Sequence, residues 1–538
     1  MSGAEGAEYT YARRASGLVR GLSLWDTFAI GLMTIQPIYG IWYVIQVGVG
    51  LFPHANLLIA LALSAVSVGF SSPLVWGILG ASMPRSGGEY IYNSRILHPA
   101  IALGASFANE AAVIYWNFFI SSWVASPSLA ILAQYMGWTG LANFVANKYG
   151  VFTLAMACFV AAFLAVAFGV KYFKLIQWPM LVIGIAGPII LAVVLSICSK
   201  AAFIQHWNTA AAKYHSLTYH AFVSAAGTAA GAPMPRTWNW TDTIGVMSVM
   251  FTLFIYAYAC VYLSGEVKRP DKTVFQASWL AIVIPVAIVA WTFAAIYHLV
   301  DFNFLSAAAH NDLFGDVKGY AFPYSTSYMT LAYLASGRSW VIAVVASLTF
   351  LFTSYWVVVI DILLPSRAIF AWGMDRMGPK WFTDINPRWA SPVKNQLLFT
   401  CIGIVGTACY LLWFTSELTG LVATGMQLVS VFLVTGIAAI VFPYRKKVRG
   451  IWESSPYRRW KVAGVPLITI AGTVYVAFIG LALYYAFFAP QTRDINARKA
   501  ILFVCAWAAG LLWYYIWKSR SAKVGIDVSM TYGELPPE

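Results

Sequence analysis

The stretch TIQPIYGIWYVIQVG, residues 34–48, interrupts a long apolar run that begins near Trp25. Gln36, Pro37 and Gly40 lie close together at the centre of this run, where a membrane helix is expected to be regular. Pro37 removes one backbone hydrogen bond, and its ring clashes with the preceding turn. Unpaired backbone groups in lipid cost several kcal/mol each, so broken backbone at membrane depth is tolerated only where it is buried in protein or lines a cavity. We therefore expect a discontinuous helix whose break helps to form a solute site.

Apolar segments of this kind recur along the whole chain. Of the 538 residues, 60% are hydrophobic and only 10% are charged, whereas a soluble protein carries about 25% charged residues. Because about 20 apolar residues cross a hydrocarbon core of about 30 Å, we predict an all-α polytopic membrane protein with twelve transmembrane helices. They are expected near residues 24–48, 55–80, 99–135, 151–170, 175–198, 242–264, 275–300, 338–368, 394–415, 418–442, 464–488 and 498–518.

The distribution of lysine and arginine predicts the orientation. With the N-terminus inside, 25 of the 34 basic residues fall on the inner side, as the positive-inside rule requires. The sequence thus predicts a multi-pass protein of the cell membrane with a cytoplasmic N-tail (1–22), a transmembrane transporter domain (23–518) and a cytoplasmic C-tail (519–538). The net charge of +14 is explained by these inner loops, so we expect a lipid bilayer and no nucleic acid as partner.

A second break is expected at the centre of residues 242–264, where Ile255-Tyr256-Ala257-Tyr258-Ala259-Cys260 places two tyrosines between small residues. This span runs opposite to the first and follows it by five spans, which is the spacing of a five-plus-five inverted repeat followed by two C-terminal helices. In such folds the two discontinuous helices meet at the midplane. Their ends bind anionic groups and their exposed carbonyls bind cations. An α-amino acid suits such a site, as do other zwitterions.

Three predicted inner loops carry a family resemblance. They are ASMPRSGGEYIYNSRILHPAIALGASF (81–107), SGEVKRPDKTVFQAS (264–278) and PSRAIFAWGMDRMGPKWFTDINPRWASPV (365–393). Together with the tail VGIDVSMTYGELPPE, they resemble the corresponding segments of the amino acid–polyamine–organocation (APC) permeases. The resemblance implies the LeuT-type fold, with helices 1 and 6 broken at the midplane, and secondary transport of amino acids or related amines.

The chain departs from the family pattern at both breaks. Residues 37–41 contain one glycine where the family usually has two, and Ile255, Tyr256 and Ala257 stand where helix 6 usually has glycines. Gly184 lies near the position where some proton-coupled members carry a lysine in helix 5. Fewer glycines make a close approach of ligand to backbone harder.

The expected substrate-binding residues surround the two breaks. They are Gln36, Pro37, Ile38, Tyr39, Gly40, Ile41, Asn117, Ile255, Tyr256, Ala257 and Tyr258. Four rings at the breaks could form a gate or surround an amine through cation–π contacts: Tyr39, Trp42, Tyr256 and Tyr258. The alternative for Gln36 and Asn117 is interhelical hydrogen bonding, and the alternative for the rings is ordinary packing.

Two acids lie within predicted helices, Glu110 and Asp361. Intramembrane acids are costly and by default functional, so both are candidates for ion coupling. The alternatives are a structural acid bonded to neighbouring helices and, for Asp361, a pair with a loop arginine. Five further charged residues are expected to form an inner ion network or gate: Arg85, Glu89, Glu266, Lys268 and Arg367.

These features predict a secondary active transporter that works by alternating access, takes a small-molecule amino acid or amine, and couples to H⁺. A sodium-coupled symporter, an exchanger of the same fold and a passive channel are the alternatives. No HExxH, GxSxG or P-loop motif appears, which argues against an enzyme. The six cysteines show no metal-ligand spacing, and no cofactor is expected.

Overall fold

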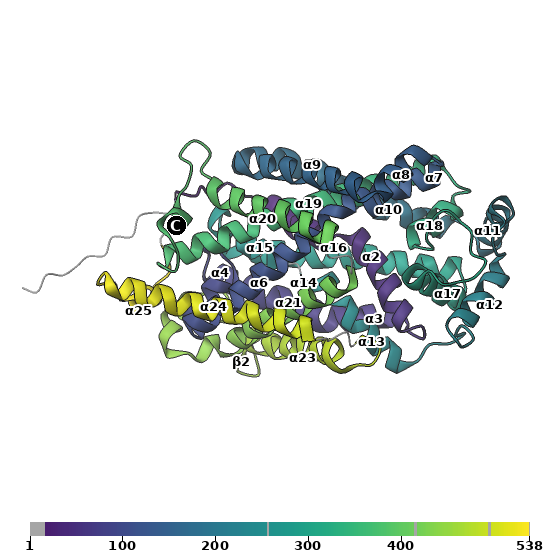
Figure 1. Ribbon diagram of the computed structural model, residues 1–538. Helices are drawn as coiled ribbons and strands as arrows, with labels where there is room; N and C mark the ends of the chain where they lie inside the picture. The colour runs from purple at the N-terminus through teal and green to yellow at the C-terminus, as the bar shows by residue number, and fades with distance from the viewer. Residues whose placement is uncertain (1–16, 256–257, 414–416, 493–496, 537–538) are drawn as a thin grey trace, which may run out of the picture.

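The computed structural model describes residues 17–255, 258–413, 417–492 and 497–536, and Figure 1 shows a bundle of long helices. Eleven helical segments within these residues are long and apolar enough to cross a membrane, so the chain is a polytopic all-α membrane protein. They are built from α1 (Leu24–Ile35) with α2 (Pro37–Tyr43) and η1 (Val44–Val49); α3 (Leu57–Ser64) with η2 (Ala65–Gly69) and α4 (Phe70–Ser82); α6 (Pro99–Ile120) with η3 (Ser121–Val124), η4 (Ala125–Leu129) and α7 (Ala130–Met136); α9 (Lys148–Ala167); α10 (Val170–Ile197); α16 (Pro270–Leu299); α19 (Trp340–Met374); α20 (Val393–Trp413); α21 (Glu417–Val441); α23 (Leu467–Phe488); and α24 (Ala497–Lys523).

The predicted span 242–264 is present as a broken helix. It consists of α13 (Trp240–Met250), α14 (Thr252–Ile255) and α15 (Ala259–Tyr262), and it ends in the turn η6 (Ser264–Glu266). Two residues of its break, Tyr256 and Ala257, lie outside the described residues. The count of twelve spans and the five-plus-five repeat stay predictions.

Shorter elements cover the two ends of the bundle. We call the end of the bundle where α25 (Val528–Thr531) lies the terminal face and the opposite end the far face (Figure 1). Near the far face lie α8 (Thr139–Ala146), α11 (Lys200–Tyr214), α12 (Tyr219–Ala229), α17 (Phe302–Phe314) and α18 (Tyr328–Ala335). Between the spans of the terminal face lie α5 (Glu89–Ile96), η7 (Lys380–Thr383), η8 (Phe442–Tyr444), η9 (Lys446–Val448), α22 (Arg449–Ser454), β1 (Lys461–Val462), β2 (Val465–Pro466) and α25 (Val528–Thr531).

The two strands form an antiparallel hairpin in which Val462 pairs with Val465. Its two turn residues, Ala463 and Gly464, both have positive φ values. Positive φ at both central positions is the geometry of the two-residue turn that matches the twist of a hairpin.

The first helix begins at a capping box, because Ser23 and Asp26 have the spacing that predicts a helix start. Ser23 accepts a hydrogen bond from the Asp26 amide, and the Asp26 carboxylate accepts one from the Ser23 amide. This capping box satisfies free N–H groups at the helix start. Asp26 also pairs with Lys174 of α10 at 2.6 Å, which fixes the first helix against the fifth.

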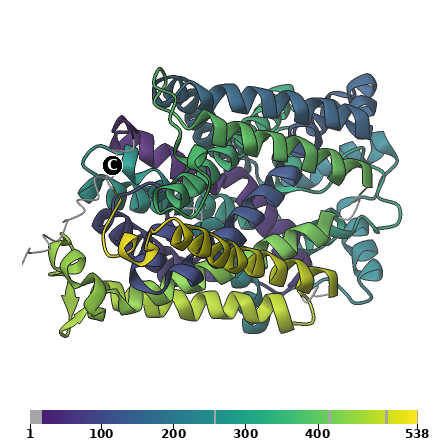
Figure 2. The same ribbon diagram turned by 60° about the vertical axis from the view of Figure 1, so that its left-hand side comes forward.

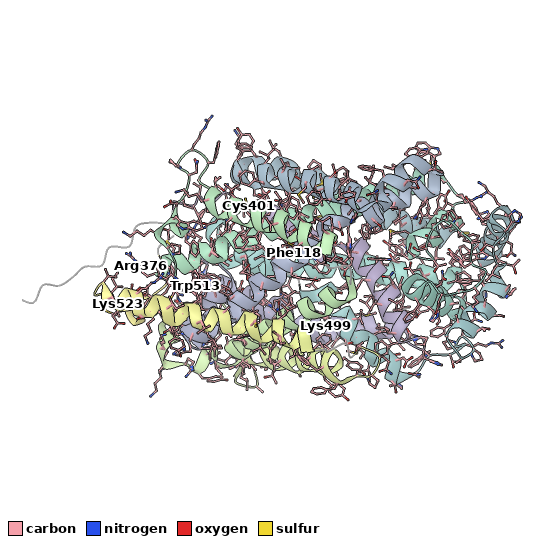
Figure 3. All side chains as sticks on the ribbon, in the orientation of Figure 1. Phe118, Arg376, Cys401, Lys499, Trp513 and Lys523 are labelled. Atoms are coloured by element: carbon pink, nitrogen blue, oxygen red, sulfur yellow. The ribbon has the colours of Figure 1, made fainter. Side chains whose placement is uncertain are left out.

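The C-terminal elements lie along the outside of the bundle. Figure 2 shows α24, in yellow, crossing in front of the helices, and it packs on α6. Figure 3 labels Lys499 and Lys523 towards its two ends. Exposed apolar side chains line α24, including Ile501, Leu502 and Val504. A long helix with such an exposed apolar surface is expected to face lipid.

The end of the chain returns to the terminal face. Tyr532 is buried, and its hydroxyl lies 3.2 Å from that of Tyr90 in α5. The guanidinium of Arg95 lies 5.3 Å from the Tyr532 ring centroid. Arg85 donates a hydrogen bond to the carbonyl of Pro536. Residues 532–536 thus cover the loop and helix between the second and third spans.

Candidate functional site

The break in the first helix lies where the sequence places it. Gln36 has a left-handed backbone conformation, with φ of 52° and ψ of 78°, and Pro37 opens the following helix α2. Gln36 is 2% exposed, and its Oε1 has no hydrogen-bond partner among the described residues. A buried amide oxygen without a partner is costly, so this atom is available to a bound solute.

The second broken helix lies directly against the first. A Cβ added to Gly40 would come within 2.1 Å of Leu253 Cδ2 in α14, so the absence of a side chain at Gly40 leaves room for this contact. On the other side of the break, the Cys260 thiol in α15 donates to the Thr27 carbonyl in α1 at 3.4 Å. The helices that flank the second break, α14 and α15, therefore lie against α2 and α1, which flank the first. Of the other predicted break residues, Tyr256 and Ala257 lie outside the described residues, and the same holds for the side chain of Ile255.

Aromatic rings cover the far side of the break, and we call them the far aromatic cluster: Tyr39, Trp42, Tyr43, Trp116, Phe119, Trp123 and Phe350. Trp123 lies at the centre, with centroids 4.9 Å from both Tyr39 and Phe119 and 5.4 Å from Trp42. Asn117, beside Trp116 in sequence, is 2% exposed and has an unpartnered Oδ1 in the part of the chain that is described. Tyr39 and Trp42 were predicted here, whereas Trp116 and Trp123 were not.

Tyr258 points elsewhere. Its ring packs on Trp76 and Phe432 at centroid distances of 5.6 and 5.2 Å, outside the far aromatic cluster. Ile38 and Ile41 are fully buried in the hydrophobic core. These three residues support the break through packing.

Beyond the far aromatic cluster, Asp312 of α17 connects to the first helix. Trp42 donates its indole N–H to Asp312 Oδ2 at 3.1 Å, and Gln46 donates to the Asp312 carbonyl at 2.8 Å. Burial raises the pKa of the Asp312 carboxyl to about 6. The sequence gives no signal for this contact, because its partners are 270 residues apart.

A cluster of carboxyl groups lies on the terminal side of the break. The Tyr262 hydroxyl donates to Glu89 and lies 3.5 Å from Glu110 Oε1. Asn109 donates its amide to the Tyr262 oxygen at 2.7 Å and to Glu110 Oε1 at 3.3 Å. Glu89, predicted as a gate residue, and Glu110, predicted as a coupling residue, therefore belong to one cluster.

Asp361 lies near this cluster on α19. It is 6% exposed, interacts electrostatically with Glu110, and makes no ion pair with any described residue. The alternative of a pair with a loop arginine is not observed, because Arg367 pairs with Glu266 instead.

Buried ion pairs join the segments of the terminal face. Arg367 contacts both carboxylate oxygens of Glu266, at 2.9 and 3.2 Å. Arg95 contacts both oxygens of Asp375, at 2.5 and 2.7 Å. The Lys268 side chain is exposed. Its backbone N–H donates to the Leu22 carbonyl and so joins the segment after η6 to the start of the first helix. Of the five charged residues expected in an inner network or gate, Glu266 and Arg367 form an ion pair. The Arg95–Asp375 pair was not singled out from the sequence.

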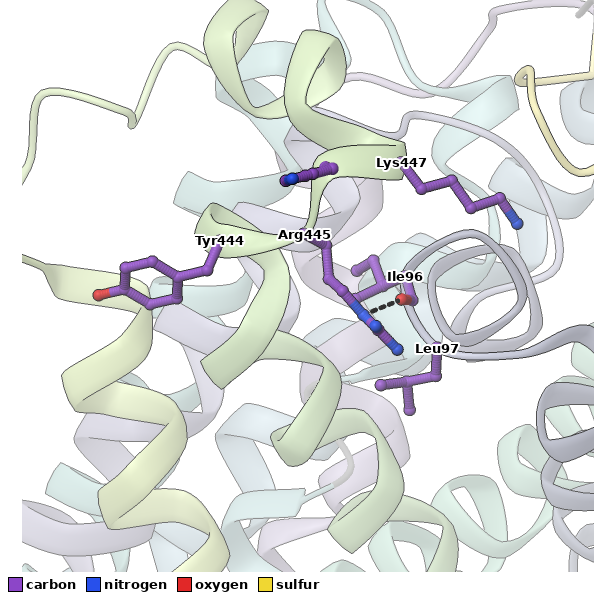
Figure 4. A pocket seen from close by; sticks show the side chains of 6 residues that line it. Ile96, Leu97, Tyr444, Arg445 and Lys447 are labelled. Atoms are coloured by element: carbon purple, nitrogen blue, oxygen red, sulfur yellow. Dashed lines mark hydrogen bonds between the residues drawn. The ribbon is translucent and has the colours of Figure 1, made fainter.

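A surface pocket lies away from the break, at the end of α5. It is lined by Ile96, Leu97, Tyr444, Arg445, Lys446 and Lys447, and Arg445 donates to the Ile96 carbonyl (Figure 4). Its three cationic side chains distinguish it from the neutral amides at the break. No group of three or more His, Cys, Asp or Glu side chains among the described residues is placed to hold a metal ion.

Comparison with known proteins agrees with this arrangement. The family model for amino acid permeases matches residues 22–510. Uncharacterized transporters of Mycobacterium bovis and Mycobacterium tuberculosis are 24% identical over 477 residues, which cover 86% of this chain and 86% of each relative. The match extends over nearly the whole membrane-spanning part, so the chain belongs to the amino acid permease family.

Proposed function

We propose that the protein is a secondary active transporter of amino acids or related amines. The main support is the contact between two discontinuous, oppositely directed helices with the buried, unpartnered amide of Gln36 at the break. Broken helices at the midplane form the solute site in transporters built from inverted repeats. The membrane-protein fold and the family membership are consistent with this function.

In the proposed site, Gln36 and Asn117 accept hydrogen bonds from the solute. Their carbonyl oxygens are buried and have no partner among the described residues. Tyr39 and Trp42 contribute aromatic faces that attract an ammonium group. Pro37 and Gly40 shape the site through the backbone of the first break. Alternating access then moves the solute, as one group of helices rocks against the other.

We assign the terminal face to the cytoplasm, because the inner segments carry most of the lysine and arginine. Both tails are then cytoplasmic, on either side of a single transporter domain in the cell membrane. The solute enters past the far aromatic cluster and leaves past the Glu266–Arg367 pair.

The proposed coupling ion is H⁺. Glu110 and Asp361 are buried carboxyl groups with no cationic partner among the described residues. Burying an unpaired carboxylate is costly, and binding a proton removes that cost. A sodium-coupled symporter or an exchanger of the same fold is the second candidate.

Uptake into liposomes tests the proposal. Purified protein is offered a labelled panel of amino acids and polyamines under an inward proton gradient and, separately, under a sodium gradient. Saturable uptake raised by the proton gradient alone is the expected result. Stimulation by sodium alone would assign the coupling ion to sodium. Flux that does not saturate would indicate a channel and contradict the proposal.

One variant tests the coupling residue. Glu110→Gln should abolish proton-driven accumulation but retain counterflow exchange, because exchange needs no net proton movement. Glu453→Gln serves as the matched control, since Glu453 is an exposed carboxylate of the terminal face that pairs with Arg449. Unchanged driven uptake in Glu110→Gln would exclude its role.

A further inference from the structure

Glu89 is held close to Tyr262 by the backbone around it. Gly88 precedes Glu89 with φ of 55°, and a Cβ there would lie 2.3 Å from Cε2 of Tyr262. Gly87 donates its N–H to the Tyr262 carbonyl at 3.1 Å. Two glycines thus allow the start of α5 to approach the end of α15. This approach brings a loop carboxyl next to Glu110, a carboxyl in the third span.

The hydrogens in this cluster are too few for its oxygens. Tyr262 has one hydroxyl hydrogen, and Asn109 directs its amide group to Glu110 and to the Tyr262 oxygen. Three buried acceptors remain without a partner among the described residues: Glu89 Oε1, Glu110 Oε2 and Asn109 Oδ1. The Asn109 oxygen belongs to a neutral amide rather than to either acid, and the Asn109 side chain is 1% exposed. Buried acceptors without a donor are rare in native structures, so at least one further partner, such as a proton, a water molecule or a cation, belongs in this cluster.

The basic groups nearby are engaged elsewhere. Arg367 pairs with Glu266, and Arg95 pairs with Asp375. Neither Glu89 nor Glu110 makes an ion pair with a Lys or Arg side chain in the described ranges. The facing titratable groups on the other elements are Asp361 on α19 and Tyr258 and Tyr262 on α15. None of these supplies a positive charge.

We propose that Glu89 and Glu110, bridged by Tyr262 and Asn109, form a two-carboxyl site that binds one shared proton and carries the proton coupling. This inference rests on the proposed function and adds to it the loop residue Glu89 and the bridging hydroxyl. Two neighbouring carboxyls in a buried site hold a proton because both cannot be ionised at once. Burial also raises the pKa of Glu89 to about 7, despite the opposing effect of the Tyr262 hydrogen bond.

The position of the two-carboxyl site connects release of the proton to opening of the transporter at the terminal face. Tyr262 lies at the end of the second broken helix, whereas Glu89 lies on α5 and Glu110 on α6. Movement of α15 away from α5 at the terminal face breaks the Tyr262–Glu89 contact and admits water. The pKa of a hydrated glutamate is about 4.3. The shared proton then passes from the carboxyl to water on the cytoplasmic side.

Infrared titration of the purified, detergent-solubilised protein measures this site without transport. The carbonyl band of protonated carboxyls is followed against pH for the native chain, Glu89→Gln, Glu110→Gln and the double variant. A shared site predicts that each single replacement moves the titration of the remaining carboxyl to lower pH, because its like-charged neighbour is gone. Two independent sites predict that the remaining carboxyl titrates as before, which would overturn the inference.

Transport by the same variants gives a second readout. Glu89→Gln should abolish proton-driven accumulation and retain counterflow, and the double variant should be no worse than either single variant. Tyr262→Phe keeps the ring but removes the bridge, so the pH midpoint of driven uptake should shift while exchange persists. Driven uptake with a native pH profile in Glu89→Gln would contradict the proposal. Glu453→Gln is again the control and should behave as the native chain.

Two further outcomes separate the possible failures. Absence of proton-driven uptake in the native protein refutes the proposed coupling, whereas the infrared titration still decides whether the carboxyls share a proton. If sodium shifts the carboxyl titration of the native chain to lower pH but does not shift that of Glu89→Gln, the site binds sodium. That result overturns the assignment to a proton.

Discussion

The two sides of the broken helices are closed by different interactions. On the far side, Tyr39 and Trp42 pack with rings from α6, η3 and α19, and the contacts are mainly apolar. On the terminal side, charged groups are buried against one another, as in Glu266–Arg367 and Arg95–Asp375. Burial of apolar surface is non-directional and tolerates small displacements, whereas buried ion pairs have a strict geometry. The terminal side should therefore respond steeply to a lost partner, and the far side gradually.

The largest effect is expected from breaking the Arg95–Asp375 pair. Asp375→Asn leaves the Arg95 charge buried without its counterion, which costs about 3–5 kcal/mol in the free energy of unfolding. Unfolding of the purified protein in detergent measures this loss. The double replacement Arg95→Met with Asp375→Leu should be less destabilising than Asp375→Asn alone, because it leaves no buried charge. Equal losses in both variants would contradict the assignment of the cost to an unpaired charge.

A smaller loss is expected in the far aromatic cluster. Trp123→Leu removes ring contacts with Tyr39, Trp42 and Phe119, each worth about 0.5–1.5 kcal/mol. We expect a loss of about 1–3 kcal/mol in total, because the smaller side chain retains part of the apolar contact. Unfolding at low and high salt should give the same loss. A strong salt dependence would show that charge, rather than ring packing, closes this side.

Asp312 gives the far side its pH dependence. Its pKa of about 6 lies above the value in an unfolded chain, so the folded state binds the proton more readily. The free energy of unfolding should therefore rise as pH falls from about 6 to about 4, by on the order of 1–2 kcal/mol after allowance for partial exposure. Asp312→Asn should lose this rise and be more stable than the native chain above pH 6. Parallel pH profiles of stability in the native chain and Asp312→Asn would show that Asp312 is not the source of the pH dependence.

The smallest effect is expected for the exposed pair Arg449–Glu453. Its atoms lie 2.8 Å apart, but both side chains are more than half exposed. Glu453→Gln should change the free energy of unfolding by no more than about 0.5 kcal/mol, because exposed helical pairs contribute little. Unfolding of the purified variant in detergent measures this change. A loss approaching that of Asp375→Asn would contradict the distinction between buried and exposed pairs.

The sequence predicted the features that follow from local chemistry. Pro37 and its neighbours predicted the first break because proline removes a helix hydrogen bond and clashes with the preceding turn, and the capping box at Ser23 was recognisable from its spacing. It did not predict the contacts that depend on the arrangement of distant helices. Tyr262 lies 173 residues from Glu89. The only sequence signal for it was its spacing of four from Tyr258, which places both rings on one helix face.

Glu89 was singled out from the sequence, but its neighbours in space were not predicted. It was grouped with the inner charges because it lies in a loop motif, and its neighbour Glu110 was assigned separately because it lies within a span. Only the fold brings the two carboxyls to one hydroxyl. Asn109 carried no signal of its own, since an asparagine within an apolar span is as consistent with interhelical bonding as with a site.

The return of the C-terminal tail to α5 has a consequence for biosynthesis. Tyr532 and Tyr90 are separated by 442 residues, so the surface of α5 stays uncovered until the ribosome has completed almost the whole chain. Contacts between such distant residues form late and slowly. The terminal face is then the last part of the protein to assemble, and a tag fused directly to the C-terminus would be present while it does so. For expression, a tag at the N-terminus avoids this interference.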